Sequence, residues 1–516
     1  MKLYTLEGRV PERPWRVLTA EEMRRADTAA AERLGLAVCI LMELAGRSVA
    51  QLLERRYPMR PVWVLCGKGH NGGDGLVTAR YLLEAGRRVH VILAVPPEEL
   101  SGEPRAAWER LLEIGFSCRS RWSWSLWPDA GPVEPSMILV DALLGTGVKR
   151  PVEGALKHMI AWMNRSGRPV VAVDVPSGLS SDTGAEQGQA VRAWDTVAMA
   201  CLKRGLLLDE GRHLSGRIWV ADIGIPDALL AEVQTFAATG PWVAAHWPRR
   251  RPGAHKYQVG RLFVLAGSPG LTGAPVLAAQ AAARIGAGAV VIGAPVSVAP
   301  LLAAKTQEVM TRALSETETG TLSMAALASA RQELARSRAG LIGPGLGRHP
   351  QTTALVAQLL SEHRSLPIVV DADGLFALSE RRELLDGSPK PWVLTPHAGE
   401  FARLAGVDPE QVRRARAELA RHWARSWGVV LVLKGMPSVV GTPEGRLWIN
   451  PTGDERLATA GSGDVLAGLI AGLLAQGLDP ERAAVAALFV GGLAAEAGPR
   501  NLLAGDILAN LEAGIP

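Results

Sequence analysis

The sequence contains few cysteines and no long apolar run. The four cysteines, Cys39, Cys66, Cys118 and Cys201, show none of the close spacings typical of metal ligands. They predict free thiols in a reducing compartment, for which we expect the cytoplasm. No window reaches the roughly 18 uncharged apolar residues that cross a bilayer, and residues 1–15 lack the apolar core of a signal peptide. We expect neither a membrane partner nor secretion.

The chain also lacks a concentrated basic tract. Its 516 residues carry a net charge of +5, and Arg outnumbers Lys, yet the densest basic run is only RRRP at 249–252 in a Pro-rich segment. Nucleic-acid-binding proteins usually gather their basic residues in one tract or on one face. We therefore expect no nucleic-acid partner, and anionic small molecules fit the charge better.

Length and patterning predict an α/β fold with two domains. A chain of 516 residues is too long for one hydrophobic core. Apolar runs such as VWVLC at 62–66 alternate with helical patterns, which is typical of parallel sheets covered on both faces. A Pro-, Gly- and Trp-rich segment follows residue 234, so we expect domains at 1–235 and 236–516. Near the N-terminus, a helix is predicted after Thr19, with Glu22 completing a capping box.

The C-terminal half contains a turn suited to phosphate. In ATAGSGDVLAGLIAGLLAQG, Gly461 and Gly463 precede Asp464 and a long apolar helix pattern. Free backbone N–H groups at a helix N-terminus converge on an anion, and Asp464 adds a carboxylate at the rim. This combination favours phosphoryl transfer, in which positioning and charge neutralisation do most of the catalysis. A plain helix cap is the structural alternative for this motif alone.

The N-terminal half contains a second candidate site. In VLCGKGHNGGDGLVTARYL, glycines between a strand and a helix allow a ligand to approach the backbone closely. Asp141 and Asp174 follow two further strands. Because the carboxyl ends of the strands line the ligand crevice of a doubly wound sheet, we expect these carboxylates at one site. A ligand-free Gly-rich turn and helix-capping aspartates are the alternatives.

These motifs, with MELAG at 42–46, resemble the NAD(P)H-hydrate epimerase family over roughly residues 15–230. The resemblance implies a Rossmann-like sheet and a potassium ion held by Asn71, Asp141 and Ser177. It also implies that the hydrated dinucleotide is bound by His70, Asn71, Gly72, Gly73, Asp74, Gly145, Thr146, Gly147, Val148, Lys149, Arg150, Pro151 and Asp174.

The same resemblance suggests how the N-terminal half acts. Asp174 would face the substrate as the leading acid or base, and Lys149 is a second catalytic candidate. Two residues depart from the family pattern: His70 stands where Asn is usual, and Leu44 replaces the Asn of MENAG.

Five motifs in the second half, HKY (255–257), GPGLG (343–347), DADGL (371–375), TPHAGE (395–400) and GSGD (461–464), occur in an order that resembles the ribokinase-like superfamily. Within it, they resemble the ADP/ATP-dependent NAD(P)H-hydrate dehydratases, over roughly residues 240–516. The resemblance implies an α/β/α sandwich that takes NADHX and NADPHX as substrates. It implies ADP as the phosphate donor and Mg²⁺ as its companion.

By the same resemblance, Asp464 is the catalytic base and Gly463 forms the anion hole. The ADP contacts would be Lys434, Gly435, Met436, Pro437, Ser438 and Gly463. The hydrated nucleotide would contact Ala274, Gly345, His397 and Asp464. The loop before GSGD departs from the family pattern at Asp454–Leu457 and Ala460, and Ala398 replaces a usual Pro.

Two other functions are compatible with parts of the chain. A vitamin-type kinase for hydroxymethylpyrimidine or thiazole shares the second fold and its GSGD motif, but it has no use for the first half. The first half could also be a binding module without activity. The leading interpretation is a bifunctional repair enzyme, which we expect to be a homo-oligomer because its helices present many small residues.

Overall fold

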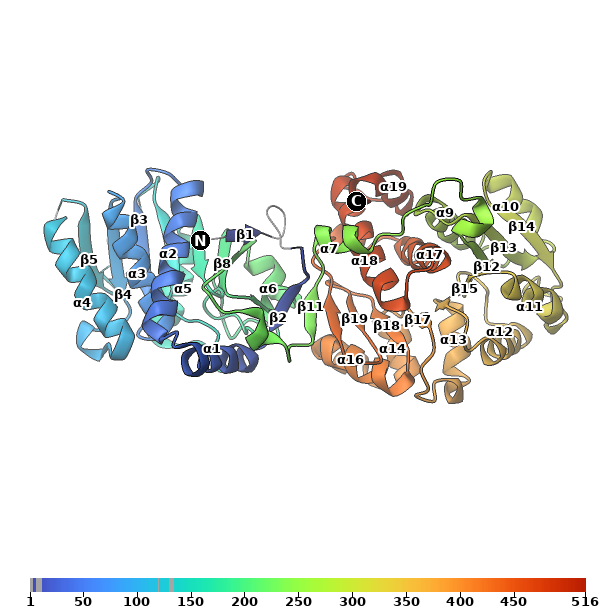
Figure 1. Cartoon of the computed structure of the whole chain (residues 1–516), viewed down its shortest axis with the longest axis horizontal. Helices are drawn as coiled ribbons and strands as arrows, with labels where there is room; N and C mark the ends of the chain where they lie inside the picture. Colours follow the sequence, from blue (N-terminus) through green and yellow to red (C-terminus); the bar gives the residue numbers. More distant parts are fainter. Residues whose placement is uncertain (1–2, 6–11, 119, 130–133) are drawn as a thin grey trace. The chain divides into compact units, whose positions relative to one another are not determined.

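The computed structural model describes residues 3–5, 12–118, 120–129 and 134–516. The chain divides into two compact units, Met1–Val233 and Gln234–Pro516, which are described separately. Figure 1 colours the first unit from blue to green and the second from green to red. The predicted α/β class with two domains built on parallel sheets is confirmed.

The first unit contains a sheet in the strand order β1-β10-β8-β7-β6-β3-β4-β5. Its strands are β1 (Leu3–Thr5), β3 (Val62–Cys66), β4 (Val89–Leu93), β5 (Trp122–Leu126), β6 (Ile138–Ala142), β7 (Val170–Val173), β8 (Asp195–Met199) and β10 (Arg217–Ala221). The pairings are parallel, apart from β1 with β10. The chain runs outward from β3 to β5 and returns as β6 on the other side of β3. A topological switch point therefore lies between β3 and β6.

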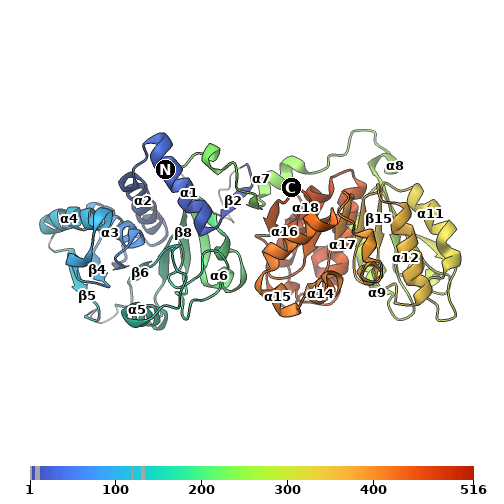
Figure 2. The same cartoon turned by 90° about the horizontal axis from the view of Figure 1, so that it is seen from below.

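Helices cover both faces of this sheet (Figure 2). They are α1 (Ala20–Leu34), α2 (Val38–Arg56), α3 (His70–Glu84), α4 (Gly102–Ser117), α5 (Gly154–Arg165) and α6 (Asp209–Leu214). On one face Val64 and Val140 pack with α2, α3 and α4, and on the other Leu65 and Leu139 pack with α5. Successive strand residues point to opposite faces, so a sheet buried on both faces needs continuous apolar strands. A short parallel pair, β2 (Trp15–Leu18) with β9 (Leu202–Lys203), belongs to the same unit.

The second unit is built on a sheet in the order β14-β13-β12-β15-β16-β17-β18-β19-β20-β11. These strands are β11 (Thr235–Ala237), β12 (Arg261–Leu265), β13 (Ala289–Pro295), β14 (Met310–Leu314), β15 (Ala339–Ile342), β16 (Ile368–Val370), β17 (Trp392–Leu394), β18 (Val430–Leu433), β19 (Val439–Gly441) and β20 (Leu447–Ile449). From β14 to β18 the pairings are parallel, and β19 is antiparallel to both of its neighbours.

The helices of this unit also form two layers (Figure 1). They are α7 (Gly240–His246), α8 (Lys256–Val259), α9 (Gly273–Arg284), α10 (Ala299–Lys305), α11 (Leu327–Ala335), α12 (Pro350–Glu362), α13 (Asp373–Ser379), α14 (Ala398–Ala405), α15 (Pro409–Arg414), α16 (Arg416–Trp427), α17 (Ser462–Ala475), α18 (Pro480–Ala497) and α19 (Ala504–Ala509). Residues of α9, α17, α18 and α19 pack on strand residues such as Leu262, Val369 and Val432. The unit is therefore a sandwich of helices around a central sheet.

Small residues of α17 serve packing inside the unit. A Cβ added to Gly468 would lie 2.1 Å from the carbonyl oxygen of Ala278, and one on Gly472 would lie 2.4 Å from the Ile285 side chain. Glycine thus lets α17 approach α9 closely. These small residues pack inside the unit, so they give no support to the expected homo-oligomer. The homo-oligomer stays a prediction.

Several local predictions are confirmed. Thr19 caps α1: its hydroxyl accepts a hydrogen bond from the Glu22 N–H at 3.2 Å, and the Glu22 carboxylate accepts one from the Thr19 N–H at 2.8 Å. All four cysteines are free, with Cys66 and Cys201 buried and the other two half-buried. Among the described residues, none of the helices has the length and hydropathy needed to cross a membrane.

The glycine-rich segment differs from expectation in one respect. Only Gly67–Gly69 form a loop, because α3 already begins at His70. The sequence HNGGDG therefore forms the first turns of the helix. Helix formation is possible there despite the unfavourable glycines because tight packing fixes the segment in place.

Candidate active sites

The first candidate site is a cavity of about 990 Å³ at the carboxyl ends of β3, β6 and β7. The loop Gly67–Gly69 follows β3, Gly145–Gly147 follow β6, and Asp174 follows β7; all of them line the cavity. This is the topological switch point of the sheet, the place where doubly wound folds bind ligands.

The glycines of this region have two different roles. A Cβ on Gly72 would lie 1.8 Å from the carbonyl oxygen of Gly67, and one on Gly67 would lie 2.0 Å from that of Leu143. These two glycines allow backbone segments to pack against each other. Gly69 and Gly147 have no atom within 4 Å of an added Cβ, and both line the cavity. They are the glycines that leave the backbone open to a ligand.

Oxygen atoms gather beside the cavity around the buried Asp141. The Ser177 hydroxyl and N–H donate to the Asp141 carboxylate at 2.6 and 2.7 Å. Asn71 Nδ2 donates to the Leu144 carbonyl at 3.0 Å, and Ser177 Oγ lies 3.2 Å from the same oxygen. Burial raises the pKa of Asp141 to about 6, although the Ser177 hydrogen bonds oppose this. The structure thus brings Asn71, Asp141 and Ser177 together.

Asp174 is held in an unusual backbone conformation with φ of 67°. Its carboxylate accepts a hydrogen bond from the Met199 N–H at 2.9 Å and forms an ion pair with Lys203. The Lys203 side chain is only 1% exposed and also donates to the Met199 carbonyl at 2.6 Å. A strained non-glycine residue at a strand end is typical of a functional site.

Two more carboxyl groups line the same cavity: Asp27 on α1 and Asp74 on α3. Burial raises the pKa of Asp27 to about 6, with the negative charge of Asp174 adding to the rise and Lys203 opposing it. The pKa of Asp74 is raised well above its usual value, again chiefly by burial. Three carboxyl groups therefore share one ammonium group.

The sequence analysis missed Lys203 and Asp27. Asp27 lies four residues after the buried Met23 and three before the buried Ala30, on the packed side of α1. A charged residue at that spacing was the available signal. Lys203 has no comparable local signal.

The structure places the other expected residues unevenly. The cavity lining includes His70, Asn71, Asp74, Gly145, Thr146, Gly147 and Asp174. Gly72 and Gly73 are buried, while Val148, Lys149, Arg150 and Pro151 lie beyond the lining, and Lys149 is exposed. Leu44 belongs to a separate groove that Cys39 and Arg110 also line. The departure at Leu44 therefore does not reach the cavity, whereas the departure at His70 does.

The second candidate site includes a cavity of about 290 Å³ between the β18–β20 region and helices α17 and α18. All residues expected to contact ADP, Lys434–Ser438 and Gly463, line it. Apolar residues of α17 and α18, including Leu466 and Leu488, complete the wall. The cavity thus combines an apolar pocket with a lysine and a helix N-terminus, which suits a nucleotide.

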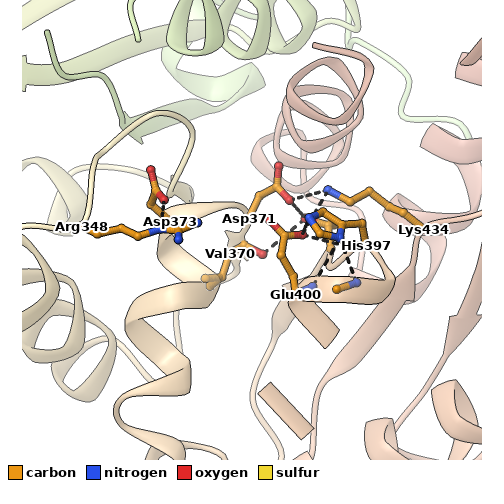
Figure 3. Close-up of polar contacts among 9 residues, drawn as sticks. Arg348, Val370, Asp371, Asp373, His397, Glu400 and Lys434 are labelled. Atoms are coloured by element: carbon orange, nitrogen blue, oxygen red, sulfur yellow. Dashed lines mark hydrogen bonds and ion pairs between the residues drawn. The ribbon is translucent and has the colours of Figure 1, made fainter. Parts of the chain in front are cut away.

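A charged cluster lies at the edge of this cavity (Figure 3). Lys434 Nζ donates to Asp371 Oδ1 at 2.8 Å and lies 4.0 Å from Glu400 Oε2. Thr395 Oγ1 donates to the same Asp371 oxygen at 2.8 Å. Burial lowers the pKa of Lys434, but the nearby carboxylates outweigh it and raise that pKa.

The carboxyl group of Asp464, in the first turn of α17, interacts electrostatically with the charged groups of this cluster. Burial raises the pKa of Asp464 to about 6; the charges of Asp371 and Glu400 add to the rise, and Lys434 opposes it. A carboxylate with a pKa of about 6 is largely ionised near neutral pH and is a stronger base than an ordinary aspartate, so it is suited to accept a proton from a substrate hydroxyl.

The residues expected to contact the hydrated nucleotide come from four places: Ala274 in the first turn of α9, Gly345 in the loop after β15, His397 at the N-cap of α14 and Asp464 in the first turn of α17. A Cβ on Gly345 would lie 3.5 Å from the Ala274 Cβ, so these two positions are neighbours. The GPGLG loop is fixed to α13 by Asp373, which accepts from Gly347 N and Arg348 Nε at 3.0 Å each (Figure 3).

His397 lies at the N-cap of α14 with its side chain 61% exposed. Its Nδ1 accepts from the N–H groups of Gly399 and Glu400 at 3.0 and 3.3 Å, and caps α14. Nε2 lies 3.6 Å from Glu400 Oε2, so Glu400 holds the ring on its other side.

The unusual loop before GSGD neutralises its own charges. Arg456 donates to both carboxylate oxygens of Asp454, with Nε–Oδ1 and Nη2–Oδ2 distances of 2.9 and 2.6 Å. Arg456 Nη1 also donates to the Gly498 carbonyl at 2.9 Å, just after α18. Asp454 and Glu455 line this cavity. The departure from the family pattern at Asp454–Leu457 therefore changes the residues of the cavity rim, while the charge of Asp454 stays paired with Arg456.

Comparisons with known proteins cover both units. A family model described as NAD(P)H-hydrate dehydratase matches residues 262–516, and one described as YjeF-related protein N-terminus matches residues 38–205. The chain is 42% identical over 513 residues to a bifunctional NAD(P)H-hydrate repair enzyme of Moorella thermoacetica, covering 95% of each chain. It is 43% identical over 516 residues to the enzyme of that name from Salinibacter ruber, covering 95% of this chain and 94% of the relative.

A solved structure also matches. It is the crystal structure of an ADP/ATP-dependent NAD(P)H-hydrate dehydratase from Bacillus subtilis co-crystallised with ATP/Mg²⁺. The two are 32% identical, with a TM-score of 0.46, and the match covers 54% of this chain and 96% of that chain.

The fold and the two cavities define a two-domain α/β enzyme in which a unit with a doubly wound parallel sheet precedes a second α/β unit that matches the dehydratase family model. The chain belongs to the family of bifunctional NAD(P)H-hydrate repair enzymes. The alternative of a vitamin-type kinase is not favoured, because the full-length relatives match across both units.

The two roles of the glycines can be separated by substitution. We expect Gly72→Ala to destabilise the first unit by about 3 kcal/mol or more, because the new Cβ would overlap a backbone carbonyl. Gly69→Ala, which meets open space, should cost less than about 1 kcal/mol. Hydrogen exchange across α3 during a urea titration measures both effects. Equal stability of the two variants would contradict the packing role of Gly72.

Proposed function

We propose that the unit at 1–235 interconverts the C6 epimers of NADHX and NADPHX, and that the unit at 236–516 dehydrates the S epimer at the expense of ADP. The observation that carries the proposal is the position of Asp464. Its half-buried carboxyl group stands at the N-terminus of α17, beside a cavity lined by Lys434 and Gly463.

In the proposed dehydration, Asp464 accepts the proton of the C6 hydroxyl as that oxygen takes the terminal phosphoryl group. The N–H groups at the start of α17 stabilise the charge that develops on the phosphoryl oxygens. Lys434, held by Asp371, adds a positive charge at the same end of the cavity. Phosphate then leaves as the ring nitrogen lone pair forms a C6–N double bond, and transfer of a C5 proton to the departing phosphate restores the C5–C6 double bond of the dihydronicotinamide. When bound, Mg²⁺ would supply charge neutralisation of the donor phosphates.

The substrate would occupy the loops beside this centre. Ala274 and Gly345 are adjacent, and the side chain of His397, whose Nε2 lies 3.6 Å from Glu400 Oε2, is exposed. The nucleotide would lie along Lys434–Ser438, with its base against the apolar wall of the cavity. ADP is proposed as the donor because Lys434–Ser438 and Gly463, the motif residues that resemble the ADP contacts of these dehydratases, all line this cavity. The Bacillus subtilis relative is described as dependent on either ADP or ATP.

In the proposed epimerisation, Asp174 is the residue that exchanges a proton with the substrate. Its carboxylate lies at the cavity wall, fixed by Lys203 and the Met199 N–H. The dinucleotide would lie along His70–Asp74 and Gly145–Gly147. The exposed Lys149 and Arg150 lie beyond the cavity lining, and we assign them to the anionic part of the ligand ahead of a role in proton transfer.

Potassium is proposed to bind at Asn71, Asp141 and Ser177. The donor set is chemically suitable, because a carboxylate, a hydroxyl and an amide carbonyl are hard oxygen ligands. Asp141 is fully buried with no positively charged partner among its hydrogen bonds in the described structure. A cation would offset the cost of ionising it there. The ion would also fix the strand ends that carry the substrate loops.

The first test is recovery of the 340 nm absorbance of NADPH from an unequilibrated mixture of NADPHX epimers, with ADP, with ATP or with neither. Full recovery with ADP is expected, because both units then act in sequence. Recovery that stops at the S fraction would contradict epimerisation. No recovery with either nucleotide would contradict the whole assignment.

Replacing Asp464 by Asn should lower the turnover of dehydration by about 10²–10⁴-fold, because the proton acceptor is lost. Nucleotide affinity, measured by calorimetry, should remain close to that of the unmodified chain. In the unmodified chain the rate should fall as pH drops through about 6, because Asp464 must be ionised to act. Glu512→Gln, at an exposed carboxylate of the same unit, is the control. Retained turnover in Asp464→Asn would exclude Asp464 as the base.

Potassium dependence tests the ion site. With ionic strength kept constant by choline chloride, the epimerisation rate should increase with KCl. Ser177→Ala should raise the half-saturating KCl concentration by about tenfold or more, since one oxygen ligand is removed. Ser181→Ala is the matched control, because Ser181 is also buried but donates to the Thr146 carbonyl instead. A rate independent of KCl in the unmodified chain would contradict the site.

A further inference from the structure

The cavity of the first unit contains more acid–base groups than the single carboxylate of Asp174. Asp27 on α1 and Asp74 on α3 line it together with Asp174, and Lys203 lies among them. These groups come from four separate elements, yet their charges interact with one another. A single proton carrier does not require such an arrangement.

We propose that Asp27 is a second catalytic residue of epimerisation, which protonates the leaving C6 hydroxyl, and that Lys203 is a positioning residue that holds Asp174. This inference rests on the proposed function of the first unit. It assigns Asp27 of α1 and Lys203 of β9 to the reaction.

The geometry supports different roles for the two aspartates. Asp174 is held in place by its backbone and by its side chain. Its φ is 67°, and its carboxylate accepts a hydrogen bond from the Met199 N–H and forms an ion pair with Lys203. Asp27 is half-buried on a helix face that opens to the same cavity. One carboxylate is thus neutralised by the ammonium group, and the other faces the ligand without that partner. Two carboxyl groups in contrasting environments are the usual basis of an acid and base pair.

Burial favours the protonated form of Asp27, and the charges around it act in both directions. Those that face it are the carboxylates of Asp174 and Asp74, the ammonium of Lys203, the ring of His70, and Arg24 one turn earlier on α1. Burial and the carboxylates raise the pKa of Asp27 to about 6, against the opposing effect of Lys203. Asp27 can therefore donate a proton near neutral pH, where an ordinary aspartic acid has already lost it.

The proposed reaction balances without a further reactant. Asp27 gives its proton to the C6 hydroxyl as the C6–O bond breaks, and the ring nitrogen lone pair forms a C6–N double bond. Water leaves, and a cationic ring remains beside the two carboxylates. Water then adds to the opposite face of C6, and Asp174 accepts its proton. Transfer of that proton back to Asp27 resets the site, and nothing is oxidised or reduced.

The test measures, by chromatography, how fast purified R-NADHX is converted to the S epimer. The reaction contains no ADP or ATP, so that no dehydration takes place. Asp27→Asn should lower the rate by about 100-fold or more. In the unmodified chain the rate should decline as pH rises through about 6, because Asp27 must be protonated. That decline should disappear in Asp27→Asn and persist in Asp27→Glu. Glu32→Gln, at an exposed site on the same helix, should behave like the unmodified chain.

The role of Lys203 is tested by the pH at which the epimerisation rate declines. Lys203→Met removes a positive charge that lowers the pKa of Asp27, so the decline should move to higher pH as the rate falls. Lys203→Arg should restore part of the rate and of the original pH profile. A purely structural role would lower the rate without moving the profile. Hydrogen exchange of α1 and β7 verifies that each variant is folded.

The outcomes separate this inference from the proposed function. If the unmodified chain does not interconvert the epimers, the proposed function of the first unit fails, and this inference fails with it. If the unmodified chain is active and folded Asp27→Asn keeps its rate and profile, Asp27 is not the acid. If Lys203→Met leaves both the rate and the profile unchanged, Lys203 has no positioning role.

Discussion

In both units a lysine is held against an aspartate that directly follows a parallel strand. Lys203 pairs with Asp174 after β7, and Lys434 pairs with Asp371 after β16. In each unit, further carboxyl groups surround that pair: Asp27 and Asp74 in the first, Glu400 and Asp464 in the second. Burying several carboxyl groups together is costly unless a cation offsets their charge. The lysine makes each cluster tolerable in the folded protein.

The balance of these charges also determines the chemistry. With one ammonium group for three carboxyl groups, the carboxyl groups cannot all ionise readily near neutral pH. Burial raises the pKa values of Asp27 and Asp464 to about 6, and the neighbouring carboxylates add to the rise. Each unit therefore contains a carboxyl group able to exchange a proton in the pH range where the cell works. The stability of each cluster and its reactivity have the same electrostatic cause.

Close backbone packing is the second requirement of the structure. Gly72 and Gly67 bring α3 and the loop after β6 together, and Gly468 allows α17 to lie against α9. In both units a glycine-dependent contact thus places the N-terminus of a helix at the carboxyl edge of the sheet. The free N–H groups of that helix then face the cavity. At the second site, the Asp454–Arg456 pair shows that the cavity rim can change its sequence while its charge stays paired.

Much of this architecture follows from short segments of the sequence. The apolar runs specify the parallel strands, and Thr19 with Glu22 specifies the start of α1 because the capping box needs only neighbouring residues. The expected ADP contacts also lie together, since most of them are consecutive in sequence. Other features were not predictable from local patterns. The helical state of HNGGDG depends on backbone contacts with distant residues.

Short-range patterns in the chain specify the fold class, the strand ends that carry Asp141 and Asp174, and the turn that carries Asp464. Which charges meet depends instead on three-dimensional packing. Lys203 and Asp27 are separated along the chain from Asp174 and from each other, and packing alone brings them to one cavity. It also placed Lys149 at the surface, outside the cavity lining. Proton affinities depend on such through-space neighbours and on burial, and neither is a property of a local segment.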